Sequence, residues 1–138
     1  MMWYRPISLV LAVIFAVTGL LFLCIPDRVV SLFNNLSPAL GMVKSPVTGF
    51  TFYLILAVGY MYMVTVLAFL MFRNPGNRYF PMLLAQAKLA SSLLSLGLFA
   101  FQAHYLIYLT NFIVDGLIGS VVIIFYFKMR GAAAWASH

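Results

Sequence analysis

Four long apolar runs dominate the chain, separated by short polar segments. They cover about residues 7–25, 50–72, 81–103 and 105–127. A helix of about 20 residues, rising 1.5 Å per residue, crosses a hydrocarbon layer of about 30 Å. Helices also pair their own backbone groups, as lipid requires. The pattern therefore predicts an all-α integral membrane protein in which residues 1–138 form a single domain, an antiparallel bundle of four transmembrane helices.

Of the three connections, only residues 26–49 leave room for further structure. Their pattern predicts a short amphipathic helix over about residues 27–37, because Pro26 suits a helix start and Pro38 ends it. Its polar face carries Asp27, Ser31, Asn34 and Asn35. Its apolar face carries Val29, Leu32, Phe33 and Leu36. We expect this helix to lie at the outer membrane interface, either as a lid over the bundle or as a contact for a partner or ligand.

Polar residues recur at helical spacing inside the apolar runs. The third run carries them at Lys88, Ser91, Ser92, Ser95 and Gln102. The fourth run places on one face His104, Tyr108, Asn111, Asp115, Gly119 and Tyr126. Weaker stripes follow the second run at Thr51, Tyr62 and Thr65, and the first run at Ser8, Ala12 and Gly19. Because polar groups turned toward lipid cost several kcal/mol, these faces should meet in a buried polar seam. Its predicted members are Asp115, Lys88, Ser91, Ser92, Ser95, Asn111, Tyr62 and Tyr108.

Lys88 and Asp115 are the two charged residues in the middle of apolar runs. Measured from the predicted inner boundary, Asp115 lies about 18 Å deep and Lys88 about 10 Å deep. Side chains also lean toward the N-terminus of their helix, which carries these two apart in an antiparallel hairpin. We therefore expect Lys88 to reach for the cytoplasmic interface, and Asp115 to bond Ser92, Ser95 or Asn111. A direct or water-mediated ion pair is the alternative.

Charge placement adds an orientation. The chain is 65% hydrophobic and 7% charged, with a net charge of +6. Its cations stand singly at the ends of apolar runs. This placement is typical of signals for membrane topology and not of a nucleic-acid-binding surface. One side carries Arg5, Arg73, Arg78, Lys128 and Arg130, and the other carries Arg28 and Lys44. This imbalance predicts that both termini are cytoplasmic, with residues 128–138 as a tail. A compact chain of this kind suits a bacterial inner membrane.

The inventory of reactive residues is short. One cysteine, Cys24, and two histidines, His104 and His138, are too few for a metal site or a bis-histidine haem within one chain. The seam serines have only Lys88 as a base, and no glycine-rich phosphate loop is present. We therefore expect no catalytic residues, no metal and no cofactor.

These observations favour a small non-enzymatic subunit or accessory protein that packs against other membrane subunits or copies of itself, surrounded by membrane lipid. A proton- or cation-coupled carrier is the alternative. In it Asp115 would titrate, Lys88 would modulate it, and the path would be lined by Ser92, Ser95, Asn111 and Tyr62. A third class is a lipid- or quinone-binding protein gated by the amphipathic helix.

Overall fold

The computed structural model describes residues 3–47 and 51–135. In these ranges every regular element is helical: α1 (Tyr4–Cys24), α2 (Pro26–Leu36), the short 3-10 helix η1 (Ser37–Leu40), α3 (Thr51–Arg73), α4 (Tyr79–Phe101) and α5 (Leu106–Trp135). The start of the second apolar run, residue 50, lies outside the described residues.

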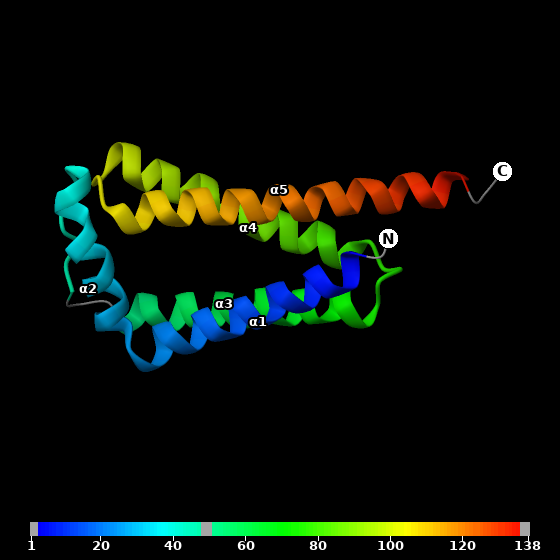
Figure 1. Cartoon of the computed structure of the whole chain (residues 1–138), viewed down its shortest axis with the longest axis horizontal. Helices are drawn as coiled ribbons and strands as arrows, with labels where there is room; N and C mark the ends of the chain where they lie inside the picture. The colour runs from blue at the N-terminus through cyan, green and yellow to red at the C-terminus, as the bar shows by residue number, and fades with distance from the viewer. Residues whose placement is uncertain (1–2, 48–50, 136–138) are drawn as a thin grey trace.

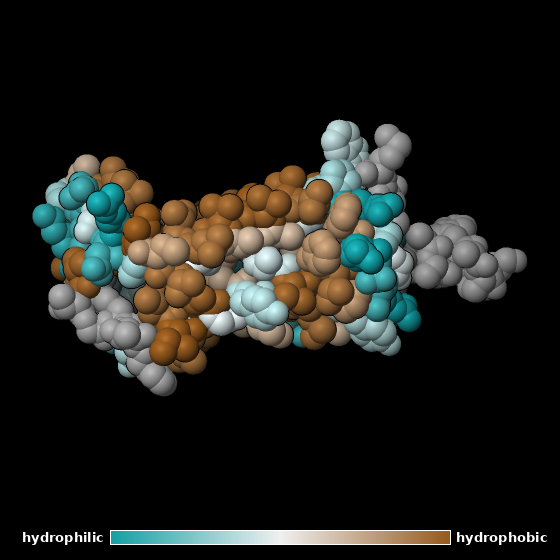
Figure 2. Space-filling model, turned by 90° about the horizontal axis from the view of Figure 1, so that it is seen from below, coloured by the Kyte–Doolittle hydropathy of each residue, from teal (hydrophilic) through white to brown (hydrophobic). Residues whose placement is uncertain are grey.

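Among the described helices, four are long and apolar enough to cross a membrane: α1, α3, α4 and α5. They correspond to the four apolar runs of the sequence. Figure 2 shows the result on one face of the molecule, where a hydrophobic belt separates two hydrophilic ends. The chain thus has the form of a multi-pass membrane protein.

The last helix continues past the end of the predicted fourth span. That span was predicted to end at about residue 127, and α5 extends into the predicted tail of residues 128–138 as far as Trp135. The physical reason is local, since three consecutive alanines, the best helix formers, follow the single glycine at position 131.

The long helices associate in two pairs, α1 with α3 and α4 with α5, and the pairs meet where α3 packs on α4. Figure 1 shows the pairs as two layers, with the chain passing back and forth between the two ends of the molecule. Small residues permit the close approach. A Cβ added at Gly19 of α1 would lie 3.1 Å from Met61 of α3. One added at Gly119 of α5 would lie 2.9 Å from Leu89 of α4.

The shared core lies between these layers, toward the end that holds both termini. Tyr4 packs edge to face on Phe125, which joins α1 to α5. All four long helices contribute buried apolar side chains, namely Tyr4, Leu11, Ala12, Phe15, Val64, Ala68, Met71, Leu84, Ala85 and Val122.

Helix α2 crosses the opposite end of the bundle, transverse to the long helices (Figure 1). Asn34 was assigned to its polar outer face, which is wrong because this side chain is buried. Its Nδ2 donates to the Ser45 carbonyl at 2.7 Å, and its Oδ1 accepts from the Ser45 amide at 2.7 Å. A carboxamide can satisfy both backbone groups of a non-helical residue at once. Asn34 therefore ties α2 to the segment that leads into α3.

The predicted apolar face of α2 is only partly covered. Val29 and Phe33 are half-buried, whereas Leu32 and Leu36 are 60% and 52% exposed. These two leucines are available to a surrounding membrane interface.

Candidate functional site

Lys88 and Asp115 form a direct ion pair in the interior of the bundle. The ammonium Nζ donates to Asp115 Oδ1 at 2.8 Å, and the side chains are only 3% and 5% exposed. The prediction that Lys88 extends toward the cytoplasmic interface was therefore wrong, as was the assignment of Ser92, Ser95 or Asn111 as the partner of Asp115. The alternative of a direct pair holds.

The register of α4 against α5 explains this error. The predicted depths assumed that the third and fourth apolar runs end in one plane. In the structure Ser92 Oγ donates to the Phe112 carbonyl at 2.8 Å, so residue 92 lies opposite residue 112. One helical turn before Ser92 in α4 lies Lys88, and about one turn after Phe112 in α5 lies Asp115, so these two residues are level with each other. The run ends are staggered because side-chain bonds, and not hydropathy, set the register.

Two aromatic rings complete the enclosure of Lys88. Its Nζ lies 4.4 Å from the ring centroid of Phe15 and 5.1 Å from that of Tyr60. Both distances suit a cation–π interaction, which gains strength where water is excluded. The four-helix cluster, defined here as Phe15, Tyr60, Lys88 and Asp115, thus takes one residue from each of α1, α3, α4 and α5.

The rest of the seam closes between α4 and α5. Asn111 Nδ2 donates to Ser95 Oγ at 2.6 Å and to Ser91 Oγ at 3.1 Å. The Ser92 side chain needs the glycine opposite it, because a Cβ on Gly116 would lie 2.9 Å from Ser92 Oγ. Five of the predicted seam residues therefore interact across this hairpin or pair with Asp115, namely Lys88, Ser91, Ser92, Ser95 and Asn111.

Two predicted members of the seam lie elsewhere. Tyr62 is 67% exposed on the outward side of α3, so its assignment to the seam was wrong. Tyr108 is half-buried and packs on Tyr105, with ring centroids 5.4 Å apart, near the start of α5 and remote from the ion pair along the helix.

Tyr60 occupies the place that was assigned to Tyr62. Its hydroxyl donates to the Ala87 carbonyl at 3.1 Å, which fixes α3 against α4 beside the ion pair. Tyr60 shares a face with Val64 and Ala68, but that face is recognised only from their burial in the structure. For Phe15 the sequence does hold a signal, since it lies between Ala12 and Gly19 on the small-residue stripe.

One oxygen of the cluster is unsatisfied. Asp115 Oδ2 is buried and has no hydrogen-bond partner among the described residues. A carboxylate oxygen in this state costs free energy relative to water. Asp115 Oδ2 therefore keeps an unused acceptor capacity while Oδ1 is in contact with Lys88.

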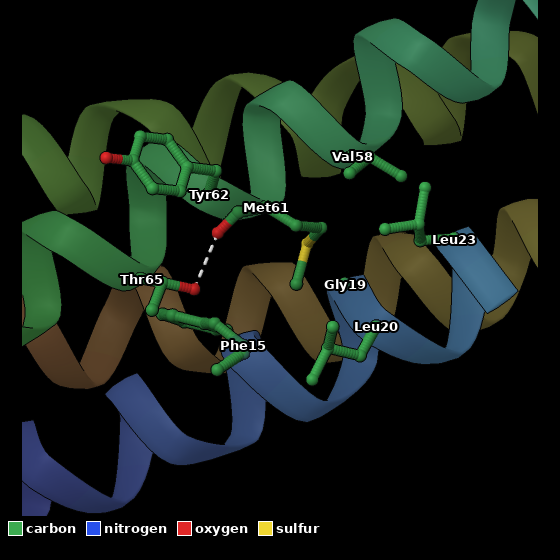
Figure 3. A pocket seen from close by; sticks show the side chains of 9 residues that line it. Phe15, Gly19, Leu20, Leu23, Val58, Met61, Tyr62 and Thr65 are labelled. Atoms are coloured by element: carbon green, nitrogen blue, oxygen red, sulfur yellow. Dashed lines mark hydrogen bonds between the residues drawn. The ribbon is translucent and has the colours of Figure 1, made fainter.

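An apolar groove of about 330 Å³ lies between α1 and α3 (Figure 3). Phe15, Tyr62 and Thr65 lie toward one end and Leu23 and Val58 toward the other. Its remaining lining residues are Ala16, Gly19, Leu20 and Met61. The Thr65 hydroxyl is committed to the Met61 carbonyl at 2.7 Å. The other side chains that line the groove are apolar except for that of Tyr62.

In the two described ranges, no three His, Cys, Asp or Glu side chains gather as a metal site would require, and Cys24 is exposed. No protein family model, curated protein or solved structure matches this chain. A functional proposal must therefore be argued from the geometry of its own residues.

Proposed function

We propose that the chain is a non-enzymatic membrane protein of four antiparallel spans that acts by packing against other membrane helices, either of other subunits or of further copies of itself. One observation carries this proposal. The polar side chains of the α4–α5 seam are bonded within the chain, whereas the outward surfaces of the spans are apolar, as at Val13, Ile55, Leu94 and Leu117. Contacts with neighbours inside the membrane would then be van der Waals packing.

In this proposal the ion pair acts as an internal clamp. A buried ion pair adds little net stability compared with an apolar pair, but it can specify one arrangement over others. Lys88 and Asp115 set the register of α4 against α5, and the rings of Phe15 and Tyr60 attach the α1–α3 pair to that register. The clamp keeps the outward apolar faces in one relative orientation for a partner.

The same proposal includes an orientation. Helix α2 lies on the membrane surface with Leu32 and Leu36 in the acyl boundary, which its transverse position and the exposure of these leucines support. The end that carries Arg5, Arg73 and Arg78 faces the cytoplasm by the positive-inside rule, in a bacterial inner membrane.

Photo-crosslinking in native membranes tests the packing proposal. A photoreactive amino acid at Leu94 of α4 (69% exposed) or at Ile55 of α3 (67% exposed) reports on two different helices. We expect one of these positions to give a single protein adduct of defined mass, and native mass spectrometry after gentle extraction to show the same complex. Lipid adducts alone at both positions, together with a lone monomer after extraction, would contradict the proposal.

A second candidate, a proton- or cation-coupled carrier, is favoured by the unsatisfied Asp115 Oδ2. In it Asp115 takes up the proton and Lys88 holds the other oxygen. The charge-neutral double variant K88M/D115L separates the two functions, because it removes the titrating group without leaving a lone buried charge. An unchanged complex together with abolished ion-driven uptake in proteoliposomes selects the carrier. If the wild type itself shows no ion-driven uptake, the result selects the packing proposal. Y62F, on the outward face of α3, is the matched control.

A further inference from the structure

One end of the bundle carries a concentration of exposed cations. The start of α1, the turn between α3 and α4 and the later part of α5 meet at this end (Figure 1). Among the side chains that the structure describes, the exposed cations at this end are Arg5, Arg73, Arg78 and Lys128. Figure 2 shows hydrophilic side chains gathered there beside the hydrophobic belt. We call these four residues the basic end.

The chain contains no side-chain carboxylate that can neutralise the basic end. It has two acidic residues in all. Asp115 is paired with Lys88 in the interior. Asp27 lies in the first turn of α2 at the opposite end of the bundle. The positive charge of the basic end therefore has no side-chain counter-charge within the chain and is open to an anion from outside it.

The surroundings of these cations match a lipid headgroup layer. Trp3 and Tyr79 are 72% and 62% exposed at this end, and such amphipathic rings favour the boundary between hydrocarbon and water. The Arg5 guanidinium lies 5.3 Å from the Phe72 ring centroid. A cation–π contact does not occupy the five N–H donors of a guanidinium, so they remain for an acceptor.

We propose that the basic end binds anionic phospholipids, with Arg73 and Arg78 on either side of the α3–α4 turn as the main phosphate contacts. Arginine forks match phosphate oxygens in pairs. Placement decides for lipid over an acidic protein, because Arg73 ends the apolar span α3 and Arg78 directly precedes the apolar span α4. The inference rests on the proposal that the chain spans a bilayer.

Nanodiscs of mixed phosphatidylglycerol and phosphatidylcholine provide the test, since both of their faces offer the same lipids whatever the orientation of the protein. Native mass spectrometry measures which lipids stay bound to the full chain. Each cation near an anionic surface contributes a factor of roughly five in affinity. We therefore expect phosphatidylglycerol to be enriched on the wild type, and R73Q/R78Q to lower that enrichment at least severalfold. The control R28Q/K44Q removes two exposed cations of the α2 end, where the exposed Asp27 adjoins Arg28, and should lower the enrichment much less.

Salt provides a measurement that needs no variant, in case R73Q/R78Q fails to fold. Because about 1 M salt shortens the screening length to about 3 Å, it should abolish the enrichment on the wild type. Equal retention of both lipids by an inserted wild type, or the same loss in R28Q/K44Q, would overturn the lipid inference alone. Failure of the wild type to insert would instead overturn the spanning proposal beneath it. Binding of an acidic protein in place of lipid would also refute the inference.

Discussion

The Lys88 ammonium and the Asp115 carboxylate meet at 2.8 Å at a point where all four long helices contribute a side chain. Neither charge has access to water, since both side chains are at least 95% buried. Each group is therefore the counter-charge of the other in a low-dielectric interior. Removal of one partner and removal of both should have very different consequences.

The first prediction compares these two cases. D115N should lower the free energy of unfolding by about 3 to 5 kcal/mol, because it leaves the ammonium buried without a counter-charge. K88M/D115L replaces the pair with apolar side chains and should cost much less. Thermal or denaturant unfolding in detergent micelles, followed by tryptophan fluorescence, measures both. If the single and the double variant lose the same free energy of unfolding, Lys88 and Asp115 do not depend on each other and the prediction is wrong.

The second prediction concerns the ring of Tyr60 beside Lys88. Y60F loses only the hydroxyl bond to Ala87 and should cost about 1 kcal/mol. Y60L loses the ring as well and should cost a further 0.5 to 2 kcal/mol or so from the cation–π interaction. In the K88M/D115L background that additional cost should disappear. Y62L, on the exposed side of the same helix, serves as the control with no effect, and a constant cost of Y60L in both backgrounds would argue against the interaction.

The third prediction uses the glycines at the α4–α5 contact. G116A would bring a Cβ to 2.9 Å from Ser92 Oγ and break the bond from Ser92 to Phe112. G119A would meet Leu89 at the same distance. Overpacking of this kind costs about 1 to 3 kcal/mol. In contrast, G97A has nothing within 4 Å of its new Cβ, so better helix propensity should stabilise it by up to about 1 kcal/mol. The reverse order of stability would contradict the packing of the hairpin.

The fourth prediction tests the attachment of α2. N34A removes both hydrogen bonds to the Ser45 backbone, together worth about 2 kcal/mol, or roughly thirtyfold in the local opening constant. Hydrogen exchange at the Ser45 amide should accelerate by that factor, while interior amides of α4 and α5 keep their rates. N35A, an exposed neighbour, should change neither. Global acceleration in N34A would mean that Asn34 supports the whole bundle.

Prediction from the sequence succeeded where a single helix decides the outcome. The apolar runs correspond to helices α1, α3, α4 and α5, and Ser91 and Ser95 of the third-run stripe do bond Asn111 of the fourth-run stripe. It failed where two helices must be aligned, as with the partner of Lys88. It also failed where a residue is neither clearly polar nor apolar, since Tyr60 and Tyr62 look alike in a hydropathy pattern yet point to opposite sides of α3.

Taken alone, the amino-acid order determined that apolar stretches of membrane-spanning length form helices, and that their rare polar groups must share faces, because hydrocarbon penalises any unpaired polar group. Tertiary packing alone decided that Lys88 faces Asp115, that Phe15 and Tyr60 enclose the ammonium, and that Asn34 holds Ser45. A hydropathy pattern carries no information on how far one helix is shifted lengthwise against its neighbour. That shift follows from interlocking glycines, serines and side-chain bonds, which act only once the helices are side by side.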